Sequence, residues 1–202
     1  MNILLLASSI ALAIVLAFSL NKQKKSSRAM EQSFWARERQ ANSVRRKSLD
    51  SLNYIHIPMD RLPFDIMADN SNIAEYQTLI RDLSTQSIVN LTGYSNTDLK
   101  LEYGTANITV LSEYDQNYTI LVRTLQQWAD TLYDAGYVEE ACVLMEFAVS
   151  TGTDISRTYY KLADIYMASG DIFQIEHLIA QAENLRTSTK DTIVRTLRES
   201  YP

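Results

Sequence analysis

Apolar and polar positions divide the 202-residue chain into four stretches with different patterns. Residues 3–20 form a continuous apolar run, residues 22–48 are polar and basic, and residues 49–64 are apolar but interrupted by proline. From residue 72 onward, apolar residues recur every three or four positions. That period is typical of amphipathic helices, so we predict an all-α protein whose helical domain covers residues 65–202.

The apolar run over residues 3–20 contains no charged residue, and its only polar side chains are serines. As a helix rising about 1.5 Å per residue it would span about 27 Å, close to the hydrocarbon thickness of a bilayer. Positive charge follows the run, beginning at Lys22, whereas it precedes the apolar core of a secretory signal peptide. We therefore predict an N-terminal single transmembrane helix, with residues 1–21 as the anchor. A cleaved signal peptide and a buried core helix are the alternatives.

Charge is distributed unevenly along a chain whose net charge is −5. Residues 22–47 hold nine basic and two acidic side chains, which gives +7, and residues 1–21 hold none, so residues 48–202 carry −12. The positive-inside rule then predicts a cell-membrane protein with its N-terminus outside and its C-terminal domain in the cytoplasm. We expect an anionic membrane surface to attract residues 22–47. The acidic remainder is expected to be repelled from nucleic acid, so no nucleic-acid partner is predicted.

Two segments connect the predicted anchor to the helical domain. Residues 22–48 are predicted to be a basic juxtamembrane stalk, either a solvated helix or a disordered segment. Residues 49–64 cannot form one helix, because Pro58 and Pro63 favour extended backbone before them. This segment is too apolar for an exposed linker, so we expect an extended strap that packs on the helical domain. A strap lying in the domain's own groove would mask it until a partner displaced it, which is a regulatory hypothesis.

Three segments of the helical domain have helix signals of their own. Residues 72–84 predict an amphipathic helix with Asn72 as its N-cap and Glu75 completing a capping box. Residues 106–132 predict either one long helix or two helices with a break between them. Residues 188–200 predict a closing helix.

Some residues match chemical motifs without indicating a site. Asn90, Asn107 and Asn117 each begin an Asn-x-Thr sequence, which accepts a glycan only in a secreted protein. In a cytoplasmic domain we interpret all three as chance matches. The single cysteine, Cys142, cannot form an internal disulfide, and its helical position predicts a buried, inert thiol.

A period of 34 residues relates two predicted helical hairpins, at 125–158 and 159–192. Large residues at equivalent positions would fill the space between the helices of a hairpin, and small ones would let the helices approach. The glycines fit where the first helix of each hairpin ends with positive φ. The equivalent pairs are Trp128 and Leu162, Ala129 and Ala163, Gly136 and Gly170, and Ala148 and Ala182.

This pattern resembles the tetratricopeptide repeat (TPR), which implies a small α-solenoid of stacked helical hairpins. Two units are fewer than the roughly three that such a stack needs, so helices within 72–122 are expected to cap one side. Members of the family bind peptides or partner helices along the face formed by the first helix of each hairpin. Carried over by position, the partner-binding groove implied here consists of Arg123, Gln126, Asp130, Tyr133, Arg157, Tyr160, Asp164 and Met167.

No catalytic motif is present: the chain has no glycine-rich phosphate loop, no paired-cysteine metal motif and no His-Glu-x-x-His sequence. We therefore predict a protein that is not an enzyme, uses no cofactor or metal, and binds a protein or peptide partner. The leading hypothesis is a membrane-anchored adaptor that recruits a partner to the cytoplasmic face of the membrane through the TPR-like groove. The alternative is a structural subunit of a membrane-associated complex or a homodimer, with the repeat surface permanently buried.

Overall fold

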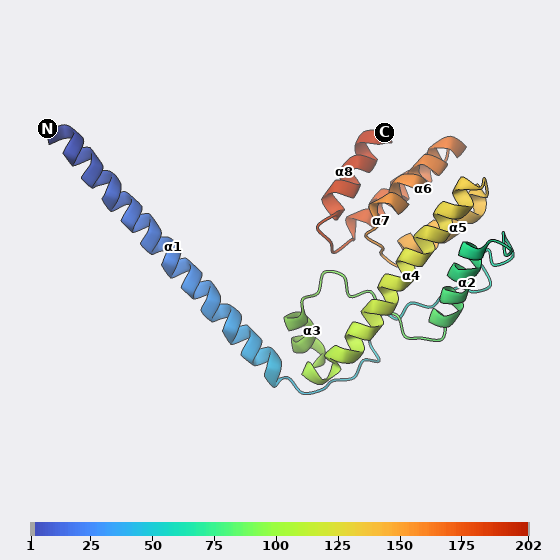
Figure 1. Cartoon of the computed structure of the whole chain (residues 1–202), viewed down its shortest axis with the longest axis horizontal. Coiled ribbons are helices and arrows are strands. Elements are labelled where there is room, and N and C mark those ends of the chain that lie inside the picture. The colour runs from blue at the N-terminus through green and yellow to red at the C-terminus, as the bar shows by residue number, and fades with distance from the viewer. Residues whose placement is uncertain (1–2, 202) are drawn as a thin grey trace. The chain divides into compact units, whose positions relative to one another are not determined.

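A computed structural model shows the fold of this chain (Figure 1). It describes the backbone of residues 3–201, together with the side chains of residues 20, 22–25, 27–28 and 30–201. Over this range all regular elements are helical, which confirms the all-α prediction. The elements are α1 (Ile3–Ser43), α2 (Ser71–Leu83), α3 (Asn96–Tyr103), the 3-10 helix η1 (Thr105–Asn107), α4 (Ile108–Asp134), α5 (Val138–Ser150), α6 (Ser156–Ser169), α7 (Ile172–Glu183) and α8 (Lys190–Ser200).

The N-terminal helix corrects one part of the fold prediction. Among the described residues, no helix combines the length and the apolar character needed to cross a membrane, which contradicts the predicted single-pass transmembrane helix. The side chains of residues 3–19, on which that prediction rested, lie outside the described residues. The helix also does not end near Asn21 but continues through the basic stretch to Ser43, so the predicted stalk is helical over most of its length.

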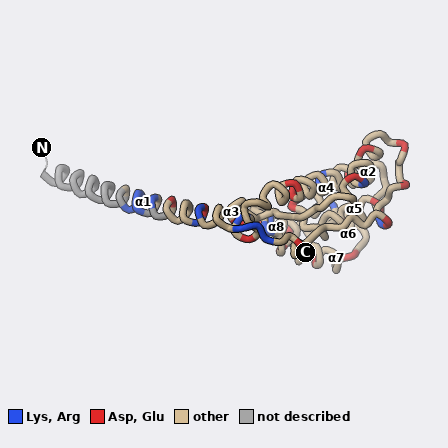
Figure 2. The backbone as a smooth tube through the Cα atoms, turned by 90° about the horizontal axis from the view of Figure 1, so that it is seen from below, with Lys and Arg blue, Asp and Glu red and all other residues tan. Residues whose placement is uncertain are grey.

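The chain forms two compact units, Met1–Lys47 with Ser95–Ile108 and Ser48–Tyr94 with Thr109–Pro202. In the first unit, the C-terminal end of α1 packs with α3 and η1, and Ala41 is fully buried there. An ion pair between Glu38 and Lys100 joins α1 to α3. The hydrogen bond with Lys100 is the main reason that the pKa of the Glu38 carboxyl is lowered. Lys and Arg residues, blue in Figure 2, recur along the described part of α1.

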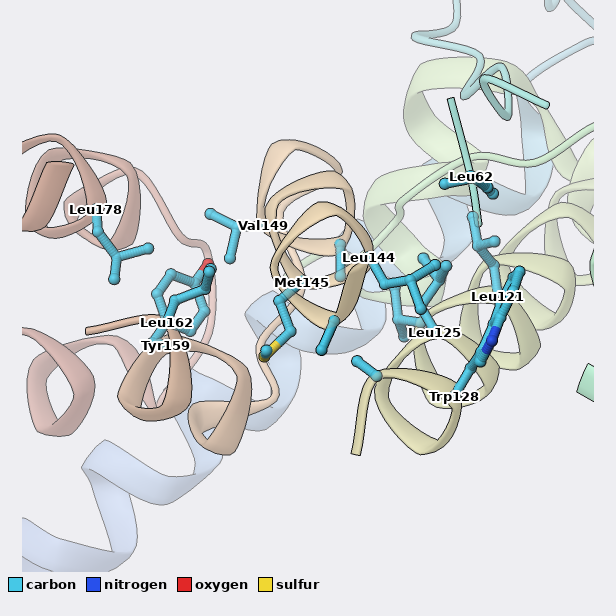
Figure 3. Close-up of a cluster of buried hydrophobic side chains, with 14 of the residues drawn as sticks. Leu62, Leu121, Leu125, Trp128, Leu144, Met145, Val149, Tyr159, Leu162 and Leu178 are labelled. Carbon is cyan, nitrogen blue, oxygen red and sulfur yellow. The ribbon is translucent and has the colours of Figure 1, made fainter. Parts of the chain in front are cut away.

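The second unit is a stack of antiparallel helices whose core is formed by the strap, α2 and α4 to α8. α5 and α6 pack together, as do α6 and α7, and α7 and α8. The residues that the 34-residue period placed inside the hairpins are buried: Trp128, Ala129 and Ala163 have no exposed surface. Figure 3 shows the centre of this core, where the labelled side chains are Leu62, Leu121, Leu125, Trp128, Leu144, Met145, Val149, Tyr159, Leu162 and Leu178.

Glycine ends the first helix of both hairpins in the same way. Gly136 has φ 90° and Gly170 has φ 75°, a region that residues with a Cβ rarely adopt. Beyond Gly136, the Tyr137 N–H donates to the Leu132 carbonyl at 2.9 Å, and Asp171 makes the equivalent bond beyond Gly170 at 2.9 Å. These bonds satisfy helix carbonyls that would otherwise lack a donor, so both turns are rigid.

The start of α2 differs from the prediction by two residues. Asn70, and not Asn72, is the N-cap, and its Oδ1 accepts from the N–H groups of Asn72 at 3.0 Å and Ile73 at 3.3 Å. Gln77 of α2 is buried, and its side-chain amide donates to the carbonyl of Phe64 at 2.8 Å. A polar residue can occupy that buried position because the strap supplies an acceptor for its amide.

The strap at 49–64 packs against the core of the second unit. Leu62 is buried, the Ile55 N–H donates to the Ile88 carbonyl at 2.9 Å, and an isolated antiparallel bridge joins Tyr54 to Val89. The Phe64 ring lies 5.3 Å from the ring of Trp128, centroid to centroid. The strap therefore covers apolar side chains that α4 would otherwise expose.

The three asparagines of the Asn-x-Thr sequences have structural roles. Asn107 is fully buried, and its Nδ2 donates to the carbonyls of Lys47 at 2.8 Å and Tyr103 at 2.7 Å. Asn117 donates to the Ser87 carbonyl at 3.0 Å, and Asn90 Nδ2 donates to backbone carbonyls and to a tyrosine hydroxyl. These amide nitrogens are engaged within the fold, so none is available as a glycan acceptor while the chain is folded.

Candidate protein-interaction surfaces

The predicted groove contains a polar seam between α4 and α6. Gln126 is buried and accepts a hydrogen bond from the Thr158 hydroxyl. Asp130 pairs with two cations of α6: its Oδ1 lies 2.6 Å from Lys161 Nζ, and its Oδ2 lies 3.3 Å from Arg157 Nε. The Lys161 and Asp130 atoms of the shorter pair are shielded from solvent. Removing one partner of a shielded ion pair is costly, because the other charge is then left buried and unpaired.

A second seam involves the C-terminal end of the chain. The Tyr201 hydroxyl donates to the Asp164 carboxylate and, at 3.4 Å, to the carbonyl of Tyr160. On the other side of α6, Lys161 Nζ lies 4.5 Å from the centre of the Tyr133 ring. Tyr201, which follows α8, is therefore attached to α6, and α6 is attached to α4.

The groove residues thus serve mainly to join helices to one another. Arg123 and Met167 are exposed, but the polar groups of Gln126, Asp130 and Asp164 are already engaged by neighbouring helices. Among the described residues, the hydrogen bonds and ion pairs of these side chains run to α6 and Tyr201 and not to the strap. A ligand in this groove would have to displace intramolecular partners, and the energy of the hydrogen bonds and ion pairs that it breaks would weaken its binding.

A different surface lies where the first helix of each hairpin turns into the second, and we call it the turn edge. Its apolar side chains contact the core little: Phe173 is 73% exposed and Ile172 is 54% exposed. The turn edge consists of Tyr137 and Val138 from the α4–α5 hairpin and Met167, Ile172 and Phe173 from the α6–α7 hairpin.

Antiparallel packing brings these residues to the same end of the stack. The end of α4, the start of α5, the end of α6 and the start of α7 meet there because each turn is short (Figure 1). A contact between α5 and α6 fixes their register: the Tyr166 hydroxyl donates to Glu146 Oε1 at 2.8 Å, and the Cys142 thiol lies 3.5 Å from that same oxygen. The two hairpins therefore present their turns as neighbours.

The charged residues that flank the turn-edge side chains in sequence are acidic: Asp134, Glu139, Glu140 and Asp171. One cation of α6 comes close to them, since Lys161 Nζ lies 3.8 Å from Asp134 Oδ1. Residues 134–156 and 162–185 contain no Lys or Arg. They contain nine acids, which are Asp134, Glu139, Glu140, Glu146, Asp154, Asp164, Asp171, Glu176 and Glu183. Apolar side chains beside a mainly acidic rim favour a partner that combines apolar residues with basic ones.

Sequence reasoning identified the hairpins but missed this edge. The missed signal is the pair Ile172-Phe173, which follows the turn at Gly170. Turn-flanking positions are usually polar, and the core-facing positions of α7 are supplied by Ile175, Leu178 and Ala182. Two large apolar residues that the core does not use were therefore already a sign of a surface contact.

Cys142 shares a carboxylate oxygen with Tyr166 but is a poor nucleophile. Burial, followed by the negative charge of Glu146, raises the pKa of the Cys142 thiol to about 12. Burial and the hydrogen bond to Glu146, burial first, also raise the pKa of the Tyr166 hydroxyl. A thiol must ionise to react, so Cys142 is inert at neutral pH. The sequence had predicted a buried position, whereas Cys142 is half-buried.

The native thiol is expected to react with iodoacetamide at pH about 8.5 roughly three orders of magnitude more slowly than the urea-unfolded chain, whose thiol has a pKa of about 8.5. Because the folded pKa is the higher one, the thiol stabilises the fold below about pH 8.5, and this contribution is lost as the pH rises toward 12. Alkylation rates followed by mass spectrometry test this.

Two glutamine variants test how much the charge of Glu146 contributes to the slow alkylation of the Cys142 thiol. Glu146→Gln should speed alkylation of the native protein because it removes the charge beside the thiol. Glu139→Gln, at an exposed position of the same helix, should leave the rate unchanged. Equal alkylation rates in folded and unfolded protein would contradict the raised pKa of the Cys142 thiol.

Comparisons with known proteins add no family. No protein-family model, no curated protein and no solved structure matches this chain. The resemblance to the TPR therefore stays a prediction. Among the residues that the structure describes, no group of His, Cys, Asp and Glu is arranged to hold a metal ion.

Proposed function

We propose that this protein is a protein-interaction module that docks a basic, partly apolar helical segment of a partner on the turn edge. The single observation that carries the proposal is the exposure of Phe173 and Ile172 beside an acidic rim, on two rigid hairpins. The hypothesis of an adaptor is kept, but the predicted groove is replaced by the turn edge as the binding surface.

A partner gains binding free energy by covering the apolar surface that the fold leaves exposed at the turn edge. Burying a fully exposed large apolar side chain is worth about 1.5–3 kcal/mol. Phe173 is 73% exposed, so a partner that covers it gains most of that value, whereas covering Val138, at 38% exposed, gains less. The acidic rim adds attraction for a basic partner and raises its association rate.

The turn edge is also better preorganised than the groove as a docking surface. The turns at Gly136 and Gly170 are closed by hydrogen bonds within each hairpin, so a partner need not order them. Binding at the turn edge also leaves the hydrogen bonds and ion pairs of the hairpins intact, whereas the groove would have to release the ion pairs of Asp130.

A photo-crosslinking amino acid at position 173 tests the proposal in cells that produce the protein. We expect a light-dependent adduct whose crosslinked segment in the partner is basic and contains apolar residues. Reversing the rim charge with Glu139→Lys and Glu140→Lys should reduce the adduct, because the attraction for basic groups is then lost.

The matched control is the same crosslinker at Ser150, which is exposed at the other end of α5. It should not give that adduct. The proposal is wrong if position 173 gives no adduct, if Ser150 gives the same one, or if the captured segment is acidic.

A further inference from the structure

We infer that the segment docked on the turn edge is the basic helix of a second copy of this chain, at residues 22–39 of α1. This inference rests on the proposed function and names its partner. The resulting assembly would be head to tail, because one copy contributes its helix and the other its turn edge.

The chemistry of α1 matches that of the turn edge. Three large apolar side chains on α1 are exposed: Met30 at 64%, Phe34 at 55% and Trp35 at 51%. The Phe34 and Trp35 rings lie 5.3 Å apart in an edge-to-face arrangement, so they form one apolar surface. Such a surface on a helix in water favours a protein contact.

The position of these residues on the helix shows that their face is left uncovered. Met30, Phe34 and Ala41 are separated by four and seven residues, which places them on one side of α1. Farther along this side, Ala41 is fully buried, and its carbonyl accepts a hydrogen bond from Thr105 of η1 at 3.2 Å. At Met30 and Phe34 the same side is exposed.

The charges of α1 and of the turn edge are opposite in sign, which identifies a second copy of the chain as the partner. Residues 22–39 hold six basic and two acidic side chains, which gives +4, whereas residues 48–202 carry −12. The two hairpins that form the turn edge have no Lys or Arg between 134 and 156 or between 162 and 185. Arg28 and Arg39 flank the exposed apolar side chains of α1 and are themselves exposed. The chain thus contains both a basic apolar helix and an acidic apolar edge, which are complementary surfaces for two copies.

Sedimentation velocity on the full chain tests the inference. The wild type should associate as its concentration rises, and association should weaken between about 0.1 M and about 1 M salt, where the Debye length falls from about 10 Å to about 3 Å. The edge variant Ile172→Asp with Phe173→Asp, and the helix variant Phe34→Asp with Trp35→Asp, should each weaken association by about tenfold or more. Leu79→Asp, at an exposed apolar position of α2, is the matched control and should associate like the wild type.

Mixing the two variants is the decisive step. In a head-to-tail contact, the intact helix of the edge variant can still bind the intact edge of the helix variant, so the mixture should form dimers that do not grow further. The inference is overturned if the wild type stays monomeric, if either variant associates as strongly as the wild type, or if the mixture stays monomeric. Circular dichroism of each variant shows that its helices are retained.

These outcomes are distinct from those of the proposed function. An adduct at position 173 that joins two copies of the chain supports both. An adduct with a different protein, together with a monomeric wild type, retains the turn edge as a docking surface and rejects the second copy as its occupant.

Discussion

Trp128→Ala is expected to lower the free energy of unfolding of the second unit by about 3–5 kcal/mol, which is the range for removing a large aromatic side chain from a core. Trp128 has no exposed surface, and its ring packs 5.3 Å from the Phe64 ring of the strap. The substitution leaves a cavity where α4 meets the strap, so both pack less tightly. Urea unfolding followed by far-ultraviolet circular dichroism measures the change.

Two further variants make this prediction specific. Trp128→Phe should cost less, because the indole N–H of Trp128 has no hydrogen-bond partner among the described residues and its removal breaks none. Trp35→Ala, at the other tryptophan of the chain, should change stability by no more than about 0.5 kcal/mol because its side chain is 51% exposed. Equal effects at positions 128 and 35 would contradict the packing described for the core.

Asn107→Ala is expected to have the second largest effect, and it should act on the first unit. The Asn107 Nδ2 satisfies two backbone carbonyls, those of Lys47 and Tyr103, and its Oδ1 accepts from Arg46 Nε at 3.0 Å. Alanine removes these hydrogen bonds, at about 1–3 kcal/mol for each buried group that stays unsatisfied. The Tyr103 carbonyl still accepts from the Lys47 N–H at 3.0 Å. The amides of α3 and of the end of α1 should therefore exchange with solvent deuterium much faster.

Asn96→Ala provides the control for this variant. Asn96 is exposed at the first position of α3, so its loss should leave exchange in the rest of α3 unchanged. If Asn107→Ala leaves exchange in α3 as slow as in the wild type, then the asparagine does not hold α1, α3 and η1 together.

Local sequence patterns were sufficient to locate the helical hairpins. Trp128 and Gly136 illustrate why: a core position repeats with the period of a helix, and a glycine with positive φ has few alternatives to the end of a helix. The all-α architecture followed from the same signals. The two interpretations of residues 106–132 were resolved by packing, since α4 is one continuous helix.

Contacts between segments could not be predicted from those patterns. Gln77 is buried because the strap, which precedes α2 in the chain, folds back on the helix and brings the carbonyl of Phe64 within 2.8 Å of the Gln77 amide. Asp130 was assigned to a binding face by its repeat position, but the rotation of α4 against α6 places it 2.6 Å from Lys161. Rotation about a helix axis depends on all neighbours at once, and a periodic pattern determines it only approximately.

The N-terminal prediction rested on hydrophobicity and flanking charge alone. That reasoning treated residues 1–21 as a separate segment, whereas α1 runs without interruption to Ser43 and includes the basic residues that follow. The exposed side chains of Met30, Phe34 and Trp35 lie in this continuation. Their role is proposed from exposure and charge, and a hydropathy pattern does not report exposure.

Hydrogen exchange of the wild-type chain over a range of concentrations tests the central claim most directly, because it needs no substitution. If the turn edge of one copy binds the α1 helix of another, amides at the starts of α5 and α7 and in residues 22–39 should exchange more slowly as the concentration rises, and high salt should reverse this. Exchange at these amides that does not depend on concentration would contradict the claim.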